Sequence, residues 1–498
     1  MALKKVTTVQ GIVEGVPGAN PSFTVFKGIP YAAPPVGRNR WRETQPAEHW
    51  NGIYRANAFK GICPQNVAQD AKIFQMDNPY PFEKISEDCL YLNVWTPACD
   101  ANEKLPVLFA IHGGANVTGF GHQMCFDGEA FCKQNCILVT FTWRVNVFGW
   151  LTHKELSEES EHHVSGNYGI FDQIAALRWT RENIAAFGGD PENITIMGES
   201  AGGSSVFSLC LTPLTKGMFK HAIMQSGGGY DIFARNTYLS LKQMEDSMNL
   251  KKLLGVESIA EARELSDEEV ERRIHRPEAM GAYLPMQAID GYVFPYAFDV
   301  MCKKHLYHKV DYIIGYTKDE SFMYVYPNDR DQFIADQKRE YGELADQYLD
   351  LCQFLNDDRA FENHLFVRNA EMLKTAAINF AETLEENGDK AYVYCFTRDL
   401  GDGYGAYHSS ELWYLYGTLL REGRDFRGAD FELSKAMTSY WSNFAKSGNP
   451  NGEGLAEWTP YTKAEPLTMD LGVDPGMKDF GVNERILFRK KFVRGELD

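Results

Sequence analysis

The residue of this chain best suited to chemistry is a serine between glycines. Ser200 lies in the stretch Gly198-Glu199-Ser200-Ala201-Gly202-Gly203, which follows the β-branched run 193–197 and precedes the small-residue, helix-compatible stretch 204–211. A G-x-S-x-G turn places its serine on a sharp strand-to-helix bend, where glycines let neighbouring backbone approach closely. The amide of Ala201, in the first helical turn, favours negative charge beside the serine hydroxyl. The pattern predicts that Ser200 is a nucleophile.

A second glycine-rich turn supplies further hydrogen-bond donors. The apolar run 105–111 predicts a buried strand that leads directly into His112-Gly113-Gly114-Ala115. Turns of this kind direct backbone amides at the oxygen of a tetrahedral intermediate. We expect the amides of Gly114, Ala115 and Ala201 to form such an oxyanion hole; the alternative is that the glycines only make a turn.

A serine hydroxyl needs a general base, and the base needs an orienting carboxylate. In folds that carry a nucleophile turn of the G-x-S-x-G type, an acidic residue and then a histidine follow the serine along the chain, each in a loop after a strand. The strand-like run 310–315 precedes a loop with Asp319 and Glu320, and the run 391–396 precedes a glycine-rich loop and His408. His408 is the one histidine beyond His364 and so has the required position. The residues alone leave Glu320 and Asp319 open as the acid.

Longer motifs relate the chain to a known family. The segments 26–37, 87–94 and 167–203 occur in the order found in type-B carboxylesterases and cholinesterase-like proteins of the α/β-hydrolase superfamily, which the chain resembles over most of its length. The family acid is the glutamate of a Lys-Asp-Glu loop, which implies Glu320. The resemblance also implies that Glu199, Ser226 and Glu411 surround the triad of Ser200, Glu320 and His408.

The elements that must position these residues form an α/β pattern. Strand and helix alternate from about 105 to 230, which predicts an α/β-hydrolase fold, with a large, mostly parallel central sheet and helices on both of its faces. We expect residues 1–498 to form a single catalytic domain. The charged, helical segments at about 232–285 and 325–390 are predicted to be insertions that fold over the active site as a lid or gorge wall.

The chain departs from the family pattern in three places. Asn116 replaces a common aromatic residue after the oxyanion turn, Thr142-Trp143-Arg144 replaces Asn-Tyr-Arg, and Trp150 replaces phenylalanine. We hypothesise that Asn116 lines the mouth of the oxyanion loop and widens or polarises the acyl or alcohol pocket.

Composition excludes several other functions. The formal charge of −18 disfavours nucleic acid or an anionic membrane as a partner. Ten scattered cysteines give no metal-ligand spacing beyond the pair Cys132/Cys136, and we expect neither a metal nor an organic cofactor. The N-terminus resembles no secretory signal and no run is long enough to span a membrane, so we expect a cytoplasmic protein unless a leader was removed. In secreted members of the family, positions resembling Cys63 and Cys89 form a disulfide; in a reducing compartment we expect free thiols.

The resemblance implies a serine carboxylesterase that hydrolyses small aliphatic or aryl esters through an acyl-enzyme intermediate. Two alternatives are a feruloyl or cinnamoyl esterase that acts on plant cell-wall esters, and a cholinesterase-like binding protein without catalysis. Binding proteins of this kind generally lack the serine or the histidine, and this chain has both. A hydrolase of thioesters, amides or carbamates would use the same residues.

From the ordinary imidazole pKa of about 6.5 we expect activity to rise between roughly pH 5 and 8. The sequence leaves the oligomeric state open.

Overall fold

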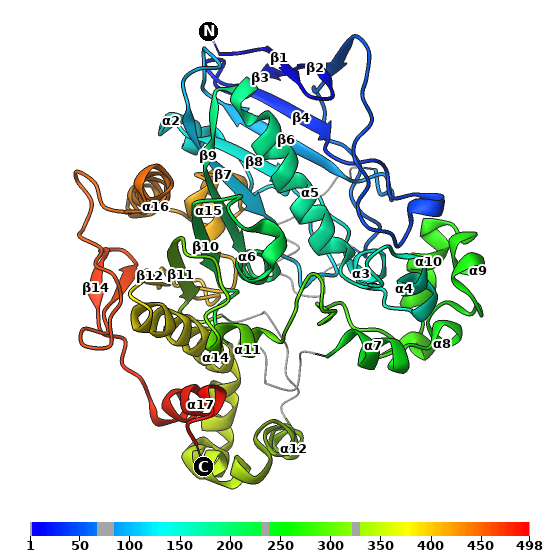
Figure 1. Cartoon of the computed structure of the whole chain (residues 1–498). Helices are drawn as coiled ribbons and strands as arrows, with labels where there is room; N and C mark the ends of the chain where they lie inside the picture. Colours follow the sequence, from blue (N-terminus) through cyan, green and yellow to red (C-terminus); the bar gives the residue numbers. More distant parts are fainter. Residues whose placement is uncertain (1, 67–83, 231–238, 321–328, 498) are drawn as a thin grey trace.

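An 11-stranded sheet runs through the computed structural model, which describes residues 2–66, 84–230, 239–320 and 329–497 (Figure 1). In spatial order the strands are β14 (Gly476–Lys478), β13 (Thr468–Leu471), β12 (Ala391–Phe396), β11 (Asp311–Thr317), β10 (His221–Gln225), β9 (Gly189–Glu199), β7 (Leu105–Ile111), β8 (Ile137–Phe141), β6 (Tyr91–Thr96), β4 (Thr24–Pro30) and β3 (Val16–Pro17). The strands from β13 through β8 run parallel, whereas β14 at one edge and β6, β4 and β3 at the other are antiparallel. The predicted mostly parallel sheet is confirmed.

The central strands are buried on both faces. Strands β8, β10 and β12 are buried at every position, as expected for parallel strands that are covered on both faces. A small separate sheet of β1 (Lys5–Thr8), β2 (Gly11–Glu14) and β5 (Ile53–Arg55) lies at the N-terminal end. The helices that pack directly on the central sheet are α2 (Glu129–Lys133), α5 (Tyr168–Asn183), α6 (Ala201–Leu211), α14 (Asp358–Glu386) and α16 (Gly428–Ser447). Helix α3 (Asn146–Trp150) packs on α5, and α15 (Glu411–Leu415) packs on α16 and, through Tyr414, on Phe396 of β12.

Two hydrophobic clusters divide between the two faces of the sheet. One contains the buried side chains of α5, α6 and α14, and the other contains those of α2, α15 and α16. Figure 1 shows α5, α6 and α14 on one side of the strands and α16 on the other. Helices therefore cover both faces of the sheet, as the sequence predicts.

Helices occupy both predicted insertions. The first contains α7 (Leu241–Ser247), α8 (Leu250–Leu254), α9 (Ile259–Arg263) and α10 (Asp267–Ile274), near α4 (Lys154–Glu159), and is followed by α11 (Phe298–Lys303); the second contains α12 (Arg330–Tyr341), α13 (Ala345–Leu351) and α14. Each of α7 to α10 begins after a serine or asparagine whose side chain accepts a backbone N–H of the first turn. Residues 232–238 and 325–328 of the predicted insertions lie outside the described residues, and the lid role stays a prediction.

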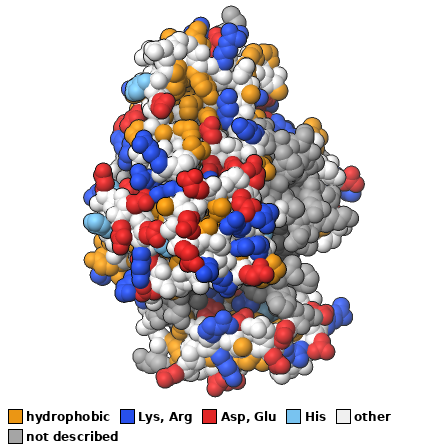
Figure 2. Space-filling model, turned by 90° about the vertical axis from the view of Figure 1, so that its right-hand side faces the viewer, with side chains coloured by type: hydrophobic (Ala, Val, Ile, Leu, Met, Phe, Trp, Pro, Cys, Tyr) orange, Lys and Arg blue, Asp and Glu red, His pale blue; other side chains and the backbone are white. Residues whose placement is uncertain are grey.

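The surface mixes charges of both signs. Figure 2 shows acidic and basic side chains interspersed over one face, with hydrophobic side chains gathered towards its upper end. Within the described ranges, no helix has both the length and the apolar character needed to cross a membrane.

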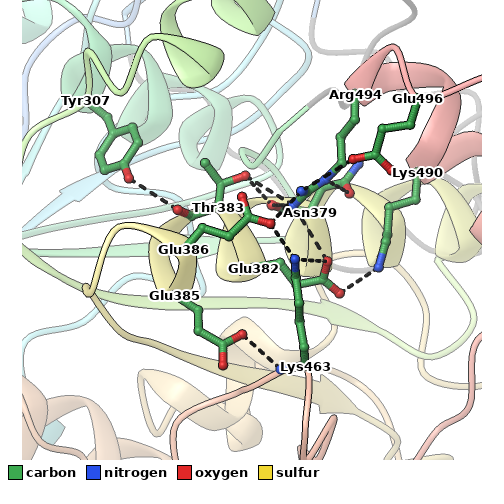
Figure 3. Close-up of polar contacts among 10 residues, drawn as sticks. All are labelled: Tyr307, Asn379, Glu382, Thr383, Glu385, Glu386, Lys463, Lys490, Arg494 and Glu496. Atoms are coloured by element: carbon green, nitrogen blue, oxygen red, sulfur yellow. Dashed lines mark hydrogen bonds and ion pairs between the residues drawn. The ribbon is translucent and has the colours of Figure 1, made fainter.

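Ion pairs hold the C-terminal helix α17 (Glu484–Arg494) on α14 (Figure 3). The carboxylate of Glu382, which is 4% exposed, lies 2.6 Å from Lys490 Nζ and 3.6 Å from Arg494 Nη2. One turn later, Glu386 accepts a 2.8 Å hydrogen bond from Arg494 Nη1 and also pairs with Lys463. Because Glu382 is buried between two cations of α17, its removal would leave their charges in a site of low polarity.

We expect Glu382→Ala to lower the free energy of unfolding by about 2 kcal/mol, since the variant keeps partly buried cations without their shared carboxylate. Urea unfolding followed by fluorescence measures this. Glu432→Ala is the control, because Glu432 pairs with Lys435 at the surface, where both side chains are 72% exposed, and its loss should leave the transition unchanged. Equal transitions for the two variants would contradict the anchoring role.

Candidate active site

Ser200 occupies a strained bend between a strand and a helix. Strand β9 ends at Glu199 and α6 begins at Ala201, and between them Ser200 has φ 57° and ψ −125°, a conformation that few residues other than glycine adopt. The neighbouring backbone leaves no room for side chains: a Cβ on Gly202 would lie 2.2 Å from the carbonyl oxygen of Ile111. The helix can therefore pack against β7 only because the bend is followed by glycine.

A continuous chain of hydrogen bonds joins three residues from separate parts of the sequence. Nε2 of His408 lies 2.8 Å from Oγ of Ser200, and Nδ1 of His408 lies 2.5 Å from Oε2 of Glu320. His408 is 4% exposed and Glu320 is fully buried. The arrangement has the geometry of a nucleophile, a general base and an orienting acid.

The acid loop distinguishes between its two neighbouring carboxyl groups. Glu320 has φ 42°, and its Oε1 accepts a 2.8 Å hydrogen bond from the amide of Thr317 while its Oε2 faces His408. Asp319 instead accepts the amide of Ala406 at 2.7 Å. Asp319 thus fixes the loop that leads to His408, and of these two carboxyl groups it is Glu320 that contacts the imidazole.

The predicted oxyanion turn lies against the serine. Gly114 and Ala115 follow β7 with φ values of 107° and 54°, and a Cβ built on Gly113 would lie 3.1 Å from Cβ of Ser200. Among the hydrogen bonds of the described residues, none is donated by the amides of Gly114, Ala115 or Ala201. These N–H groups remain available to an oxygen placed beside Ser200 Oγ.

Two further carboxyl groups, those of Glu199 and Glu411, lie near the imidazole. Oε1 of Glu199 lies 3.2 Å from His408 Nε2 and accepts a 2.7 Å hydrogen bond from Ser409 Oγ. Oε1 of the fully buried Glu411 lies 3.4 Å from Gln225 Nε2. In the described part of the chain, the second oxygen of Glu411 has no hydrogen-bond partner.

Ser226, the third residue expected around the triad, lies at the end of β10. Its backbone has φ 43°, and its amide donates a 2.8 Å hydrogen bond to the carbonyl oxygen of Gly315. Its hydroxyl is buried and, within the described residues, has no hydrogen-bond partner. The structure thus fixes Ser226 through its backbone.

Similar proteins identify the family to which the chain belongs. The model of the carboxylesterase family matches residues 2–488. The chain belongs to the carboxylesterase family. Similar proteins include the medium-chain fatty acyl-CoA hydrolase precursor of Anas platyrhynchos, 32% identical over 94% of this chain and 88% of that protein, and carboxylesterase 1C of Mus musculus, 32% identical over 92% and 88%. A solved thermophilic PNB esterase superposes with a TM-score of 0.81 at 28% identity, covering 98% and 99% of the two chains.

This carboxylesterase is therefore a serine ester hydrolase with the α/β-hydrolase fold. The named relatives support ester hydrolysis, and none of them favours the feruloyl esterase or the binding-protein alternative.

Burial and charge set the protonation of the carboxylesterase's site. Burial opposes a charged imidazole, but the carboxylates of Glu199 and Glu320 outweigh it and raise the pKa of His408 to about 9. Burial raises the pKa of Glu199 to about 7, against the opposing charge of His408. Burial and then the charges of Glu199 and Glu320 raise the pKa of Glu411 well above its ordinary value. The pKa of His408 therefore lies above the ordinary imidazole value on which the expected pH dependence was based, and the pH dependence of activity stays a prediction.

Asn116 ties the oxyanion turn to the first insertion. Asn116 has φ 62°, and its side-chain Nδ2 donates a 2.9 Å hydrogen bond to the carbonyl oxygen of Pro285. Its backbone carbonyl oxygen accepts a 2.7 Å hydrogen bond from the amide of Asn146. The other two departures are core residues: Trp143 stacks on His112 with ring centroids 4.9 Å apart, and Trp150 packs edge-on against Trp143. The role of Asn116 in the substrate pocket stays a prediction.

Some contacts of the site carry no signal in the sequence. Ser409 holds Glu199, and Asn369 of α14 donates a 3.4 Å hydrogen bond to the carbonyl oxygen of Glu320. The one hint that the sequence holds for Ser409 is its place directly after the predicted histidine. Asn369 lies in a helix 49 residues from its partner, where nothing in the local pattern indicates a contact.

Cys63 and Cys89 are buried free thiols in the structure. Sγ of Cys63 accepts the amide of Val145 at 3.4 Å, and burial followed by the nearby Cys63 raises the pKa of the Cys89 thiol well above its ordinary value. The described cysteines are thus unbridged, and the cytoplasmic location stays a prediction.

Glu199→Gln should lower the pKa of His408. The carboxylate of Glu199 favours the protonated imidazole, so its neutralisation should move the loss of that proton to lower pH by roughly one unit. A pH titration of the low-field ¹H NMR signal of the His408 ring, assigned with His408→Ala, measures the change. Glu158→Gln alters an exposed carboxylate and should leave the titration unchanged. An unchanged or higher pKa in Glu199→Gln would contradict the electrostatic assignment.

Proposed function

We propose that Ser200, His408 and Glu320 form the catalytic triad of this carboxylesterase and that it hydrolyses small aliphatic or aryl esters through an acyl-enzyme. The observation that carries the assignment is the hydrogen-bond chain of 2.8 Å and 2.5 Å from Ser200 through His408 to Glu320. The free amides of the adjacent oxyanion turn support it.

Acylation begins when neutral His408 accepts the proton of Ser200. The Ser200 oxygen forms a bond with the ester carbonyl carbon, and the carbonyl oxygen takes the negative charge towards the amides of Gly114, Ala115 and Ala201. Collapse of this intermediate breaks the bond to the alcohol oxygen, which receives the proton held by His408. A water molecule then repeats the sequence, with His408 as its base, and releases the acid.

The surrounding acids serve the same proton transfer. Glu320 accepts the Nδ1–H of His408 and so keeps Nε2 directed at Ser200. Glu199 lies 3.2 Å from Nε2 and stabilises the positive charge that the imidazole carries in the transition state. The raised pKa of Glu411 favours its uncharged form and so limits the negative charge of the buried site.

Medium-chain acyl thioesters are a second candidate substrate class. The support is the relative from Anas platyrhynchos, whose name is fatty acyl-CoA hydrolase. The same attack on a carbonyl carbon would release a thiol in place of an alcohol. Rates for p-nitrophenyl acetate, butyrate and octanoate, compared with octanoyl-CoA and methyl ferulate, separate the classes.

Asn116 is expected to act by fixing the oxyanion turn. Asn116→Ala loses the hydrogen bond to Pro285 and disfavours the positive φ, so kcat for p-nitrophenyl butyrate should fall roughly tenfold with little change in KM. Asn116→Gly accepts the same φ without the side-chain bond and should keep an intermediate kcat. If both variants matched the wild type in kcat and differed only in substrate preference, Asn116 would be a pocket residue instead.

Ser200→Ala should abolish turnover. Without the nucleophile we expect kcat for p-nitrophenyl butyrate to fall by about 10⁴-fold or more and labelling by a fluorophosphonate to disappear. Steady-state kinetics and intact-mass spectrometry measure the two effects. Ser204→Ala, one helical turn further along α6, should remain active and labelled. Turnover or labelling that persisted in Ser200→Ala would exclude Ser200 as the nucleophile.

A further inference from the structure

A buried amide side chain, that of Gln65, holds the loop that follows the oxyanion turn. Gln65 is 3% exposed. Its Oε1 accepts a 2.7 Å hydrogen bond from the amide of Gly119, and its Nε2 donates to the carbonyl oxygens of Gly119 at 3.1 Å and of Cys63 at 3.0 Å. One side chain thus binds both backbone groups of Gly119, which requires a donor and an acceptor at the same end of the side chain. A carboxamide meets this requirement.

The backbone of Gly119 lies against the first of the two glycine peptides in the turn. Gly119 has φ 105°, and a Cβ on it would lie 2.3 Å from the carbonyl oxygen of Gly113 and 2.4 Å from Nδ1 of His112. The same carbonyl oxygen accepts a 2.9 Å hydrogen bond from His112 Nδ1. Because a peptide group is planar, a fixed Gly113 carbonyl also fixes the direction of the Gly114 N–H. That N–H is one of the three expected oxyanion donors.

The next peptide of the turn is held by the residues that follow it. The amide of Thr118 donates a 2.9 Å hydrogen bond to the carbonyl oxygen of Gly114. This carbonyl shares its peptide plane with the N–H of Ala115, the second donor of the turn. The pair 118–119 therefore contacts the carbonyl side of both donor peptides, and Gln65 holds the end of that pair.

The segment that carries Gln65 is itself fixed to the start of α3. The amide of Val145 donates to Sγ of Cys63 at 3.4 Å. Nδ2 of the buried Asn146 donates a 2.6 Å hydrogen bond to the carbonyl oxygen of Pro64. Helix α3 packs in turn on α5, so the anchor of Gln65 belongs to the rigid part of the fold.

We propose that Gln65 is a positioning residue of the oxyanion hole. By binding both backbone groups of Gly119, it keeps the N–H groups of Gly114 and Ala115 directed at the oxygen that becomes negatively charged during acylation. The role rests on the proposed function, because it concerns that oxygen. Gln65 acts through Gly119, so its removal should weaken the binding of the charged intermediate and leave the binding of the uncharged ester intact.

Gln65→Met tests the role, because methionine has a similar length and volume and forms none of the three hydrogen bonds. We expect kcat for p-nitrophenyl butyrate to fall roughly 10- to 100-fold, with KM changed by less than about twofold. The affinity for 2,2,2-trifluoroacetophenone, whose adduct with Ser200 places an oxyanion in the same hole, should fall by a similar factor. The affinity for acetophenone, which forms no such adduct, should stay unchanged. Steady-state and inhibition kinetics measure the four quantities.

Gln173→Met is the matched control. Gln173 is fully buried, and its Nε2 donates a 2.9 Å hydrogen bond to Ser205 Oγ, between α5 and α6. This variant loses a buried hydrogen bond without altering the contacts of Gly119, so kcat should stay within about twofold of the wild type. Rates are expressed per site titrated with a fluorophosphonate, so that unfolded molecules do not count. Gln65→Asn, which is one methylene too short to span the same groups, should repeat the pattern of Gln65→Met.

The outcomes separate this role from the proposed function. An unchanged kcat in Gln65→Met, an equal loss of kcat in Gln173→Met, or equal losses of affinity for the two ketones would each overturn the role of Gln65, while the wild type remained an active esterase. A wild type that neither hydrolysed the ester nor became labelled at Ser200 would overturn the proposed function, and the role of Gln65 with it.

Discussion

Three carboxyl groups buried around one imidazole impose the constraint on which the rest of the structure depends. Glu199, Glu320 and Glu411 are each at most 5% exposed, and His408 is the cation with which they interact. Charges in a site of low polarity are tolerated only when they are paired or neutralised. The site meets this condition by pairing Glu320 with His408 and through the raised pKa of Glu411, which favours its uncharged form. The same burial strengthens the electrostatic effects that acyl transfer requires.

The backbone that holds these groups is strained at the ends of three neighbouring parallel strands. Ser200, Ser226 and Glu320 all have positive φ values, and they follow β9, β10 and β11. Backbone hydrogen bonds connect the bends in series, from Ser200 N to the carbonyl oxygen of Gln225 and from Ser226 N to that of Gly315, each 2.8 Å long. Because the strands are parallel and adjacent, their carboxyl ends lie at one edge of the sheet. The sheet thus provides the rigidity that strained positions need.

The parts of the site that local sequence determines were predictable, and the parts that depend on distant contacts were not. The bend at Ser200 follows from its neighbouring glycines and from the strand and helix on either side. The choice between Asp319 and Glu320 depends on Ala406, in the segment after the neighbouring strand β12, and needed the family resemblance. Likewise, the raised pKa of His408 depends on which carboxylates are buried beside it, which spacing along the chain does not reveal. The alternation of strand and helix along the chain predicted the parallel centre of the sheet. It did not predict the antiparallel strands β6, β4 and β3 at the edge.

One hydrogen bond from an asparagine side chain to a backbone carbonyl oxygen connects each helical insertion to the site. Asn116 connects the oxyanion turn to Pro285 at the end of the first insertion, and Asn369 connects the second insertion to the carbonyl oxygen of Glu320. Neither bond uses an atom of the hydrogen-bond chain from Ser200 to Glu320. Because the insertions meet the machinery at its margins, their sequences can change without altering the distances within the triad. A rigid sheet with variable helical segments at its edge therefore allows substrate preference to vary around one chemical mechanism.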